Sequence, residues 1–296
     1  MEGKQLMVDF ADLWRHEHWT RRAPDDASEW DKRAREFTSK YGPSGYSLEF
    51  LRLADLQPGE SVFDMGCGAG ALAIPCVERG HRVLAADFSP AMLERCAADV
   101  PASAAHLLET KLLAWDDNWD IAGLQVRSYD VAFASRSIAT ADMKSAIRKL
   151  SRVARRKVCA TLVSGSSPRV SDAFLADMGL TCTGHPDAAF AFAIATQLGY
   201  EPEVHFIHSS RADRYASREE AQEAYMKMLH FADEDLEGEC LASKQAEARA
   251  WVDAHLLPSS EVSFDEAVQI REVERDLPFC LDIPRTFSWA FISWEV

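Results

Sequence analysis

Short apolar runs alternate with helical patterns between residues 61 and 164. We predict strands at 62–63, 83–86, 105–113, 129–134 and 158–164. Apolar residues recur at helical spacing after Leu72, after Ser89-Pro90 and from Met143 to Val153. Buried strands that alternate strictly with helices pair in parallel, so this part predicts an open α/β sheet covered on both faces.

The alternation resumes further along and is then interrupted. A helix at 188–198, ended by Gly199, precedes a strand at 204–207, and an aromatic and β-branched strand is expected at 287–294. Ser217 with Glu220 resembles a capping box before one helix, and a second helical stretch runs from 241 to 256. We therefore predict a doubly wound, mostly parallel, seven-stranded sheet, with a helical insertion at about 210–264 before the last strand.

The first fifty residues read as helices that stand outside this alternation. Ser28 with Asp31 resembles a capping box, and the turn at 42–45 ends the helical pattern. We expect an N-terminal helical lid over 1–50 and one domain over 51–296. The aromatic residues of this segment line an acceptor pocket or belong to the core; they are Trp14, Trp19, Trp30, Tyr41 and Tyr46.

The overall charge narrows the class of partner. Forty-seven acidic residues against 32 Lys and Arg give a formal charge of −15, which opposes binding to nucleic acid or to anionic membranes. The first forty residues are locally basic, which indicates either a solvated helix face or an RNA contact. A small-molecule partner is favoured, and the oligomeric state stays open.

Cysteine spacing and hydropathy indicate a cytoplasmic protein. The seven cysteines are odd in number and at least nine residues apart, which fits neither a disulfide framework nor zinc-ligand spacing. We find neither a signal peptide pattern nor an apolar run long enough to cross a bilayer.

The stretch with the clearest chemistry is Val62-Phe63-Asp64-Met65-Gly66-Cys67-Gly68-Ala69-Gly70. Its glycines allow a tight turn where a strand passes into a helix, and they let a ligand approach backbone amides. Asp64 ends the strand and can accept hydrogen bonds from an amine. A dinucleotide site would show G-x-G-x-x-G, and an acid before the loop would repel a pyrophosphate.

A second acid follows the next predicted strand. Asp87, 23 residues after Asp64, can accept two hydrogen bonds from the vicinal hydroxyls of a ribose. The two acids and the glycines together predict a site for a nucleoside-bearing ligand without a metal.

Residues 58–165 resemble the class I S-adenosylmethionine-dependent methyltransferases, and most closely the small-molecule group that includes quinone-modifying enzymes. The resemblance rests on residues 63–70 and on Ala86-Asp87-Phe88-Ser89-Pro90-Ala91-Met92-Leu93. It implies S-adenosylmethionine as cofactor, with Asp64 near its amino group and Asp87 on its ribose. The loop residues Gly66, Cys67, Gly68 and Gly70 would contact the cofactor, while Phe88 and Met92 would flank adenine.

The family also places residues after the third and fourth strands. In the family, an acid after the third strand commonly meets the adenine amino group. The candidates here are Asp116 and Asp117, beside Trp115. Ser135-Arg136-Ser137 stands where the family places residues around the sulfonium and the acceptor, although Arg136 is equally compatible with a surface ion pair. The signatures of two classes of base methyltransferase are missing at these places.

Two pairs of histidines are further candidates for a metal site or a general base. His16 with His18, and His205 with His208, suggest a metal site or a general base, but no third ligand has supporting spacing, so we predict no metal. Methyl transfer from a sulfonium mainly requires alignment, so a catalytic dyad need not be visible. The alternatives to a small-molecule methyltransferase are a non-catalytic cofactor-binding protein or partner subunit, and an RNA methyltransferase.

Overall fold

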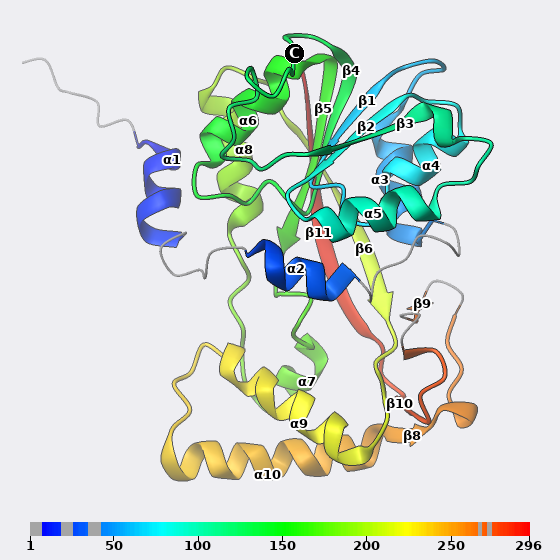
Figure 1. Ribbon diagram of the computed structural model, residues 1–296. Coiled ribbons are helices and arrows are strands. Elements are labelled where there is room, and N and C mark those ends of the chain that lie inside the picture. The colour runs from blue at the N-terminus through cyan, green and yellow to red at the C-terminus, as the bar shows by residue number, and fades with distance from the viewer. Residues whose placement is uncertain (1–7, 19–25, 35–42, 266–267, 271–273) are drawn as a thin grey trace, which may run out of the picture.

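The computed structural model describes residues 8–18, 26–34, 43–265, 268–270 and 274–296 (Figure 1). Its centre is an eight-stranded sheet with the order β3-β2-β1-β4-β5-β11-β6-β9. The strands are β1 (Val62–Met65), β2 (Val83–Asp87), β3 (Leu108–Leu112), β4 (Tyr129–Ser135), β5 (Ala154–Ser164), β6 (Glu203–Arg211), β9 (Val268–Gln269) and β11 (Arg285–Glu295).

The sheet confirms the predicted doubly wound, mostly parallel class. Strands β1 to β5 pair in parallel, and β11 lies antiparallel between β5 and β6. The predicted count of seven strands was too low by one. The additional strand, β9, has two residues and pairs with Ser210 and Arg211 at the end of β6, and a strand this short has no periodic pattern to detect. The expected start of β3 at 105 was also wrong, because a 3₁₀ turn over Ala105–Leu107 precedes it.

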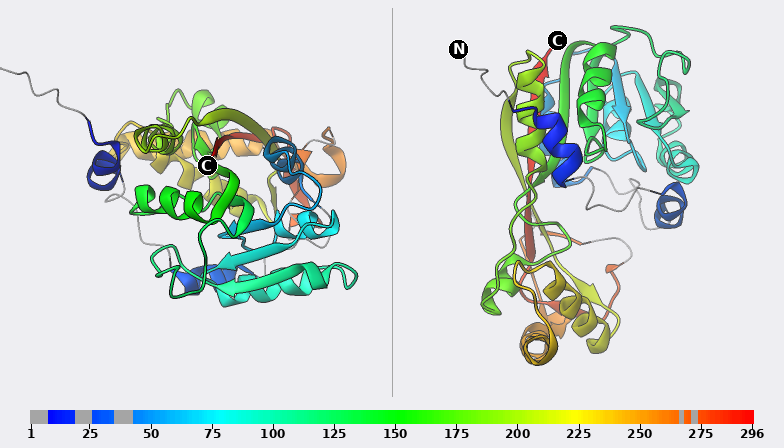
Figure 2. Two further views of the ribbon diagram at one scale, coloured as in Figure 1. Left: turned by 90° about the horizontal axis from the view of Figure 1, so that it is seen from above. Right: turned by 90° about the vertical axis from the view of Figure 1, so that its left-hand side faces the viewer.

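Helices cover both faces of the sheet, as Figure 2 shows. One face carries α3 (Gly45–Ala54), α4 (Ala73–Glu78) and α5 (Pro90–Asp99), and its core includes Phe50, whose ring packs edge-on against Phe133 and Phe291. The other face carries α6 (Met143–Val153), α8 (Asp187–Gln197) and the N-terminal α1 (Phe10–Leu13) with its π-helical turn Trp14–His18. Trp14 is fully buried there, so it belongs to the core rather than to a pocket wall.

The insertion forms a lobe below the sheet, with a core of its own (Figures 1 and 2). It contains α9 (Arg218–Met228), the 3₁₀ turn Leu229–Phe231, α10 (Gly238–His255) and the 3₁₀ turn Ser259–Glu261. A small sheet of order β7-β10-β8 was not predicted; its strands are β7 (Arg214–Tyr215), β8 (Leu256–Pro258) and β10 (Phe279–Leu281). Helix α7 (Asp172–Asp177), from the connection between β5 and α8, also joins this lobe, through Phe174 against Tyr225 and Trp251.

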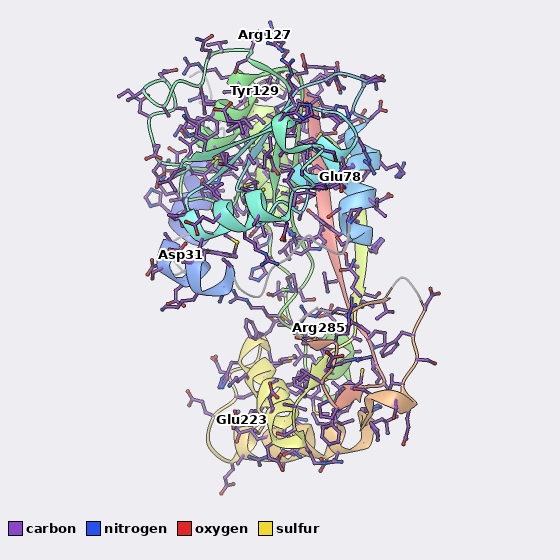
Figure 3. All side chains as sticks on the ribbon, turned by 45° about the vertical axis from the view of Figure 1, so that its right-hand side comes forward. Asp31, Glu78, Arg127, Tyr129, Glu223 and Arg285 are labelled. Carbon is purple, nitrogen blue, oxygen red and sulfur yellow. The ribbon has the colours of Figure 1, made fainter. Side chains whose placement is uncertain are left out.

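A buried ion pair lies where the lobe meets the sheet (Figure 3). Arg285, the first residue of β11, donates from Nε to Asp213 Oδ2 over 2.8 Å, and both side chains are almost wholly buried. Asp213 also contacts Arg211, and Arg285 donates to the backbone carbonyl of Pro168. The pair thus connects β6, β11 and the segment before α7.

Two capping predictions had different outcomes. The Ser217 side chain caps α9, because it accepts from the Glu220 amide over 3.1 Å, as the first half of a capping box requires. The Glu220 carboxylate accepts from the Ala216 amide over 2.9 Å rather than from that of Ser217. The box of Ser28 with Asp31 was wrong. Helix α2 (Ala27–Arg33) begins after Asp26, whose carboxylate accepts from the Ser28 amide, so Ser28 lies inside the first turn and the Asp31 side chain is left for a tertiary contact.

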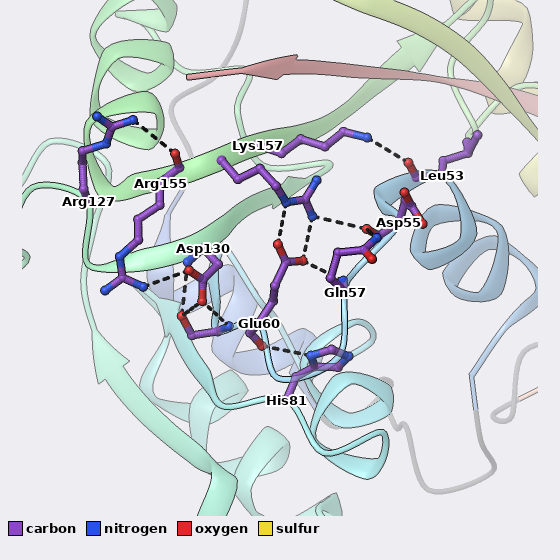
Figure 4. A network of polar contacts seen from close by, with 11 residues as sticks. Leu53, Asp55, Gln57, Glu60, His81, Arg127, Asp130, Arg155 and Lys157 are labelled. Atoms are coloured by element: carbon purple, nitrogen blue, oxygen red, sulfur yellow. Dashed lines mark hydrogen bonds and ion pairs between the residues drawn. The ribbon is translucent and has the colours of Figure 1, made fainter.

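Polar contacts fasten the amino ends of the central strands (Figure 4). Glu60, just before β1, forms a two-point ion pair with Arg156 of β5. Asp130 of β4 accepts from the Ser61 amide and hydroxyl and pairs with Arg155. These contacts hold β1, β4 and β5 in register at the edge opposite the glycine loop. Within the described ranges, we find no helix with the length and hydropathy of a membrane span.

Candidate active site

The strand order reverses between β1 and β4. From β1 the chain continues outward through β2 and β3, and it then returns to add β4 on the other side of β1. In open α/β sheets, ligands bind beyond the carboxyl ends of the strands at such a switch point. Asp64, Asp87 and Ser135 lie at the carboxyl ends of β1, β2 and β4, so the fold brings these three predicted residues to one place.

The glycine loop follows β1 and depends on positive φ angles. The amides of Gly66 and Cys67 both donate to the Ala86 carbonyl, over 2.7 and 3.0 Å, which turns the chain back over β2. A Cβ on Gly66, where φ is +74°, would lie 2.3 Å from the Cβ of Ser137. At Gly68 an added Cβ would meet nothing within 4 Å, so the backbone there faces open space. A ligand can approach the bare backbone at that position.

Asp64 is a buried carboxyl group without a hydrogen-bond or ion-pair partner among the described residues. Its side chain is 1% exposed, and neither oxygen has a hydrogen-bond partner within the part of the chain that the structure describes. Burial, together with the negative charge of Asp87, raises the pKa of Asp64 to about 7. Buried carboxylates are normally paired, because an ionised carboxylate without a partner is costly to remove from water and otherwise takes up a proton through a raised pKa. The arrangement suits a cationic ligand group that would complete the pairing.

Asp87 holds the loop and the next helix start together. Its Oδ2 accepts from the Gly68 amide and its Oδ1 from the Ser89 amide, both over 2.9 Å. Burial raises the pKa of Asp87, although hydrogen bonds from these amides partly offset that effect. Phe88 is half-buried beside it, and Met92 is buried one turn into α5.

Helix α2 of the N-terminal segment lies across this place, as Figure 3 shows for Asp31. Asp31 Oδ1 accepts from the Ser89 hydroxyl over 2.5 Å and from the Ala91 amide over 3.3 Å. Ala34 packs against Ala69 of the glycine loop and Met92 of α5, with Trp30 beside them. Sequence reasoning missed Asp31, because nothing in the chain around it indicates a contact with residues sixty positions away.

Tyr46 of α3 reaches the carboxyl end of β4. Its hydroxyl lies 2.6 Å from Ser135 Oγ and 2.6 Å from Thr161 Oγ1 of β5, within hydrogen-bonding distance of both. Burial raises the pKa of Tyr46, and the Asp64 charge adds to this while nearby Arg136 opposes it. Of the N-terminal aromatic residues that the structure describes, Tyr46 reaches the carboxyl end of β4 and Trp30 packs beside the glycine loop, while Trp14 is in the core. Trp19 and Tyr41 lie outside the described residues.

The two residues after β4 connect this hydroxyl cluster to the glycine loop. Ser137 donates from Oγ to the Met65 carbonyl over 2.6 Å. Arg136 has a left-handed backbone (φ 60°), and its guanidinium carbon lies 4.5 Å from the ring centre of Tyr46 and 5.3 Å from that of Trp289. The expected alternative, an ion pair between Arg136 and a surface carboxylate, is absent among the residues with a described structure.

Only the start of the segment after β3 lies next to the site. The Leu113 amide donates to the Asp87 carbonyl, which places the start of this segment next to β2. Trp115 packs its ring against Trp119, with 5.6 Å between ring centres, while Asp116 is exposed. Contacts of Trp115 and Asp116 with a cofactor stay predictions.

Among the side chains that the structure describes, the histidines predicted as pairs do not converge on a common site, and the side chain of His18 lies outside the described residues. His205 and His208 lie three positions apart on β6, so their side chains project from opposite faces of the sheet. His16 is exposed and contacts Asp12 within its own helical segment. In the described portion of the chain, no group of three or more His, Cys, Asp or Glu is placed to hold a metal ion.

Comparisons with known proteins find relatives of part of this chain. Residues 62–157 match a family model described as a methyltransferase domain. An uncharacterized protein of Haemophilus influenzae is 32% identical over 182 residues, which are 61% of this chain and 66% of that protein. A malonyl-[acyl-carrier protein] O-methyltransferase of Serratia marcescens is 30% identical over 128 residues, 42% of this chain and 47% of that enzyme. The matched part therefore spans less than two thirds of either relative.

Among solved structures, the YcgJ protein of Bacillus subtilis is similar with a TM-score of 0.49 and 12% identity. The alignment covers 84% of this chain and 97% of that protein.

Proposed function

We propose that the protein binds S-adenosylmethionine and transfers its methyl group to a small-molecule acceptor, a proposal that the match of residues 62–157 to a methyltransferase domain model supports. The observation that carries the proposal is the buried, unpartnered carboxyl group of Asp64 at the switch point of the sheet. The ammonium group of the cofactor's methionine portion is a cation of the kind that this carboxylate lacks.

The residues around Asp64 fit the other parts of the cofactor. Asp87 would accept from the ribose hydroxyls while it keeps the Gly68 and Ser89 amides in place. The open space at Gly68 would admit the ligand against the backbone. Met92 and Phe88 would flank adenine, with Trp115 and Asp116 on the side of β3. Gly66, Cys67 and Gly70 would shape the turn.

The bound cofactor supplies a methyl group that its sulfonium already activates. The protein's part is then to align the two reactants and to exclude water, which contributes to the rate through orientation. The Tyr46, Ser135 and Thr161 hydroxyls would orient groups at the carboxyl end of β4. Helix α2, held to α5 by Asp31, would close the cofactor side, and the insertion lobe below the sheet would bound the acceptor side. The N-terminal segment and the lobe act as the lid in this proposal.

A small-molecule acceptor is supported by two observations. The formal charge of −15 opposes a polyanionic substrate. One relative is an O-methyltransferase that acts, by its name, on malonyl groups carried by a protein, so an acyl-type acceptor is compatible with this kind of domain.

Binding and turnover test the proposal separately. Titration calorimetry should give micromolar binding of S-adenosylhomocysteine without added metal, and NADH should bind far more weakly. Release of S-adenosylhomocysteine from S-adenosylmethionine on addition of pooled small-molecule cell extract should then require the intact Asp64. Tighter binding of NADH would overturn the cofactor assignment. Binding without any release would identify a non-catalytic cofactor-binding protein, and release only with RNA would identify an RNA methyltransferase.

A further inference from the structure

Arg136 is an exposed cation whose position is fixed by its neighbours. Its backbone is left-handed, a conformation that costs a non-glycine residue roughly 1 kcal/mol, and its amide donates to Thr161 of β5 over 3.1 Å. The guanidinium lies over Tyr46 and Trp289, which restrict its side chain without neutralising the charge. No carboxylate of the described residues lies within ion-pair distance of it.

The location of Arg136 relates it to methyl transfer. It lies between Ser135, which contacts Tyr46, and Ser137, whose Cβ occupies the place that a Cβ on Gly66 would need. Arg136 is therefore one residue from the glycine loop, on the side of β4 rather than on the ribose side at Asp87. A group bound to Arg136 would lie beside the methionine portion of a cofactor held by Asp64.

An aromatic cluster continues from Arg136 along β11, with Trp289 buried and Phe287 half-buried. Phe287 and Trp289 alternate onto the face of the sheet that also carries Tyr46, and their ring centres are 6.0 Å apart. Tyr46 lies 5.9 Å from Trp289. An exposed cation at one end of an aromatic cluster, with Phe287 still partly accessible, matches a ligand with an anionic group joined to an apolar part.

We propose that the methyl acceptor carries a carboxylate or phosphate group that Arg136 binds, with its apolar part against the half-buried Phe287. The inference rests on the proposed methyltransferase function and specifies the substrate class of that site. Arg136 is a substrate-binding residue in this proposal, since the guanidinium can offer two parallel N–H donors to either anion. The cation–π contacts would keep it oriented before the acceptor arrives, which lowers the entropic cost of binding.

The test uses the full chain saturated with S-adenosylhomocysteine and three defined probes: 4-hydroxybenzoate, phenyl phosphate and the uncharged 4-hydroxybenzamide. Each is titrated by ligand-observed NMR into the wild type, Arg136→Gln and Arg148→Gln, the last being an exposed arginine of α6 that serves as the matched control. We expect at least one anion to bind saturably, with the better anion showing whether carboxylate or phosphate is preferred. Arg136→Gln should weaken that binding at least ten-fold, whereas Arg148→Gln should leave it unchanged.

The affinity for S-adenosylhomocysteine separates this inference from the proposed function. It should change less than about two-fold in Arg136→Gln, because the cofactor is held by other residues. Saturable binding of neither anion, equal binding of the amide, or unchanged binding in Arg136→Gln would overturn the inference. If the wild type does not bind S-adenosylhomocysteine, the proposed function fails, and the same titration on the unloaded protein still decides whether Arg136 binds an anion.

Discussion

The Asp87 carboxylate accepts the backbone N–H of Gly68 over 2.9 Å, so the acid at the end of β2 holds the centre of the loop that follows β1. One carboxylate thus has two tasks. It positions the loop backbone through one oxygen and the start of α5 through the other, and in the proposed function its remaining lone pairs would accept from the ribose hydroxyls.

Replacement of Asp87 should therefore weaken cofactor binding strongly. Asp87→Ala removes two charge-assisted hydrogen bonds to the ligand and should cost roughly 1.5–3 kcal/mol, or about one to two decades in the dissociation constant of S-adenosylhomocysteine. Calorimetry measures the affinity, and circular dichroism establishes that the variant is folded. An unchanged dissociation constant in a folded variant would show that Asp87 does not hold the ribose.

Cofactor affinity should depend on pH through Asp64. Burial raises its pKa to about 7 in the unliganded protein, and an ammonium group binds the ionised form, so affinity should rise as the pH increases toward 7 and level off above. Below pH 7 the affinity should fall by up to about ten-fold per pH unit. Asp64→Asn should bind weakly at every pH and lose this dependence. The same steep profile in Asp64→Asn would assign the titration to another group.

The raised pKa of Asp64 also predicts how the stability of the free protein changes with pH. The folded pKa lies above the ordinary value of 3.8, so the native state holds more protons than the unfolded chain between about pH 4 and 7. This group therefore makes the free protein less stable as the pH rises through that window. In denaturant titrations between about pH 4 and 7, the unfolding free energy of the wild type should fall with rising pH relative to that of Asp64→Asn. A relative increase would show that Asp64 is paired in solution.

Gly66 should be less tolerant of a side chain than Gly59. Both have positive φ, but a Cβ on Gly59 meets nothing within 4 Å, whereas one on Gly66 meets Ser137. Gly59→Ala should cost about 1 kcal/mol of unfolding free energy, and Gly66→Ala roughly 2–5 kcal/mol. Adding Ser137→Gly should recover about 1–3 kcal/mol of the second loss in a double-mutant cycle. Additive effects of Gly66→Ala and Ser137→Gly would rule out this contact as the cause.

The buried Arg285 and Asp213 pair should stabilise the attachment of the insertion lobe. Arg285→Met leaves the buried Asp213 carboxylate with Arg211 and the more distant Tyr225 hydroxyl beside it, and should cost about 3–5 kcal/mol. The matched control is the exposed pair of Arg218 with Asp253, where Arg218→Gln should cost less than about 1 kcal/mol. Hydrogen exchange should accelerate in α9 and α10 more than in β1 to β4. Equal effects of the two substitutions would show that the buried pair adds no stability.

Asp31 should determine how firmly α2 covers the cofactor site. Asp31→Ala removes the contacts with the Ser89 hydroxyl and the Ala91 amide, so α2 should exchange its amide protons faster. S-adenosylhomocysteine should protect residues 26–34 in the wild type and less so in the variant. Glu29→Ala, on the exposed side of the same helix, is the control. If the ligand protects residues 66–70 while 26–34 show no change in the wild type, α2 is not a lid.

Local pattern was sufficient for the sheet and its main helices. Alternation of apolar runs with helical stretches predicted β1 to β6, β11 and the helices between them. Each of these elements buries apolar residues, whose spacing along the element identifies it as a helix or a strand. The same argument explains its failures. β7, β8, β9 and β10 have two or three residues each, and the pairing that makes them strands comes from chain segments far away.

At the site, the sequence by itself determined which residues lie at the carboxyl ends of neighbouring strands, since a strand that runs into a glycine turn places Asp64 and Asp87 there through local geometry alone. The tertiary structure alone decided their surroundings. Asp31 reaches α5, α7 joins the lobe, and Arg136 lies over Trp289, 153 positions further on. Such contacts depend on how completed helices and strands pack, and a side chain's charge or hydropathy carries no information about which distant surface will be placed against it.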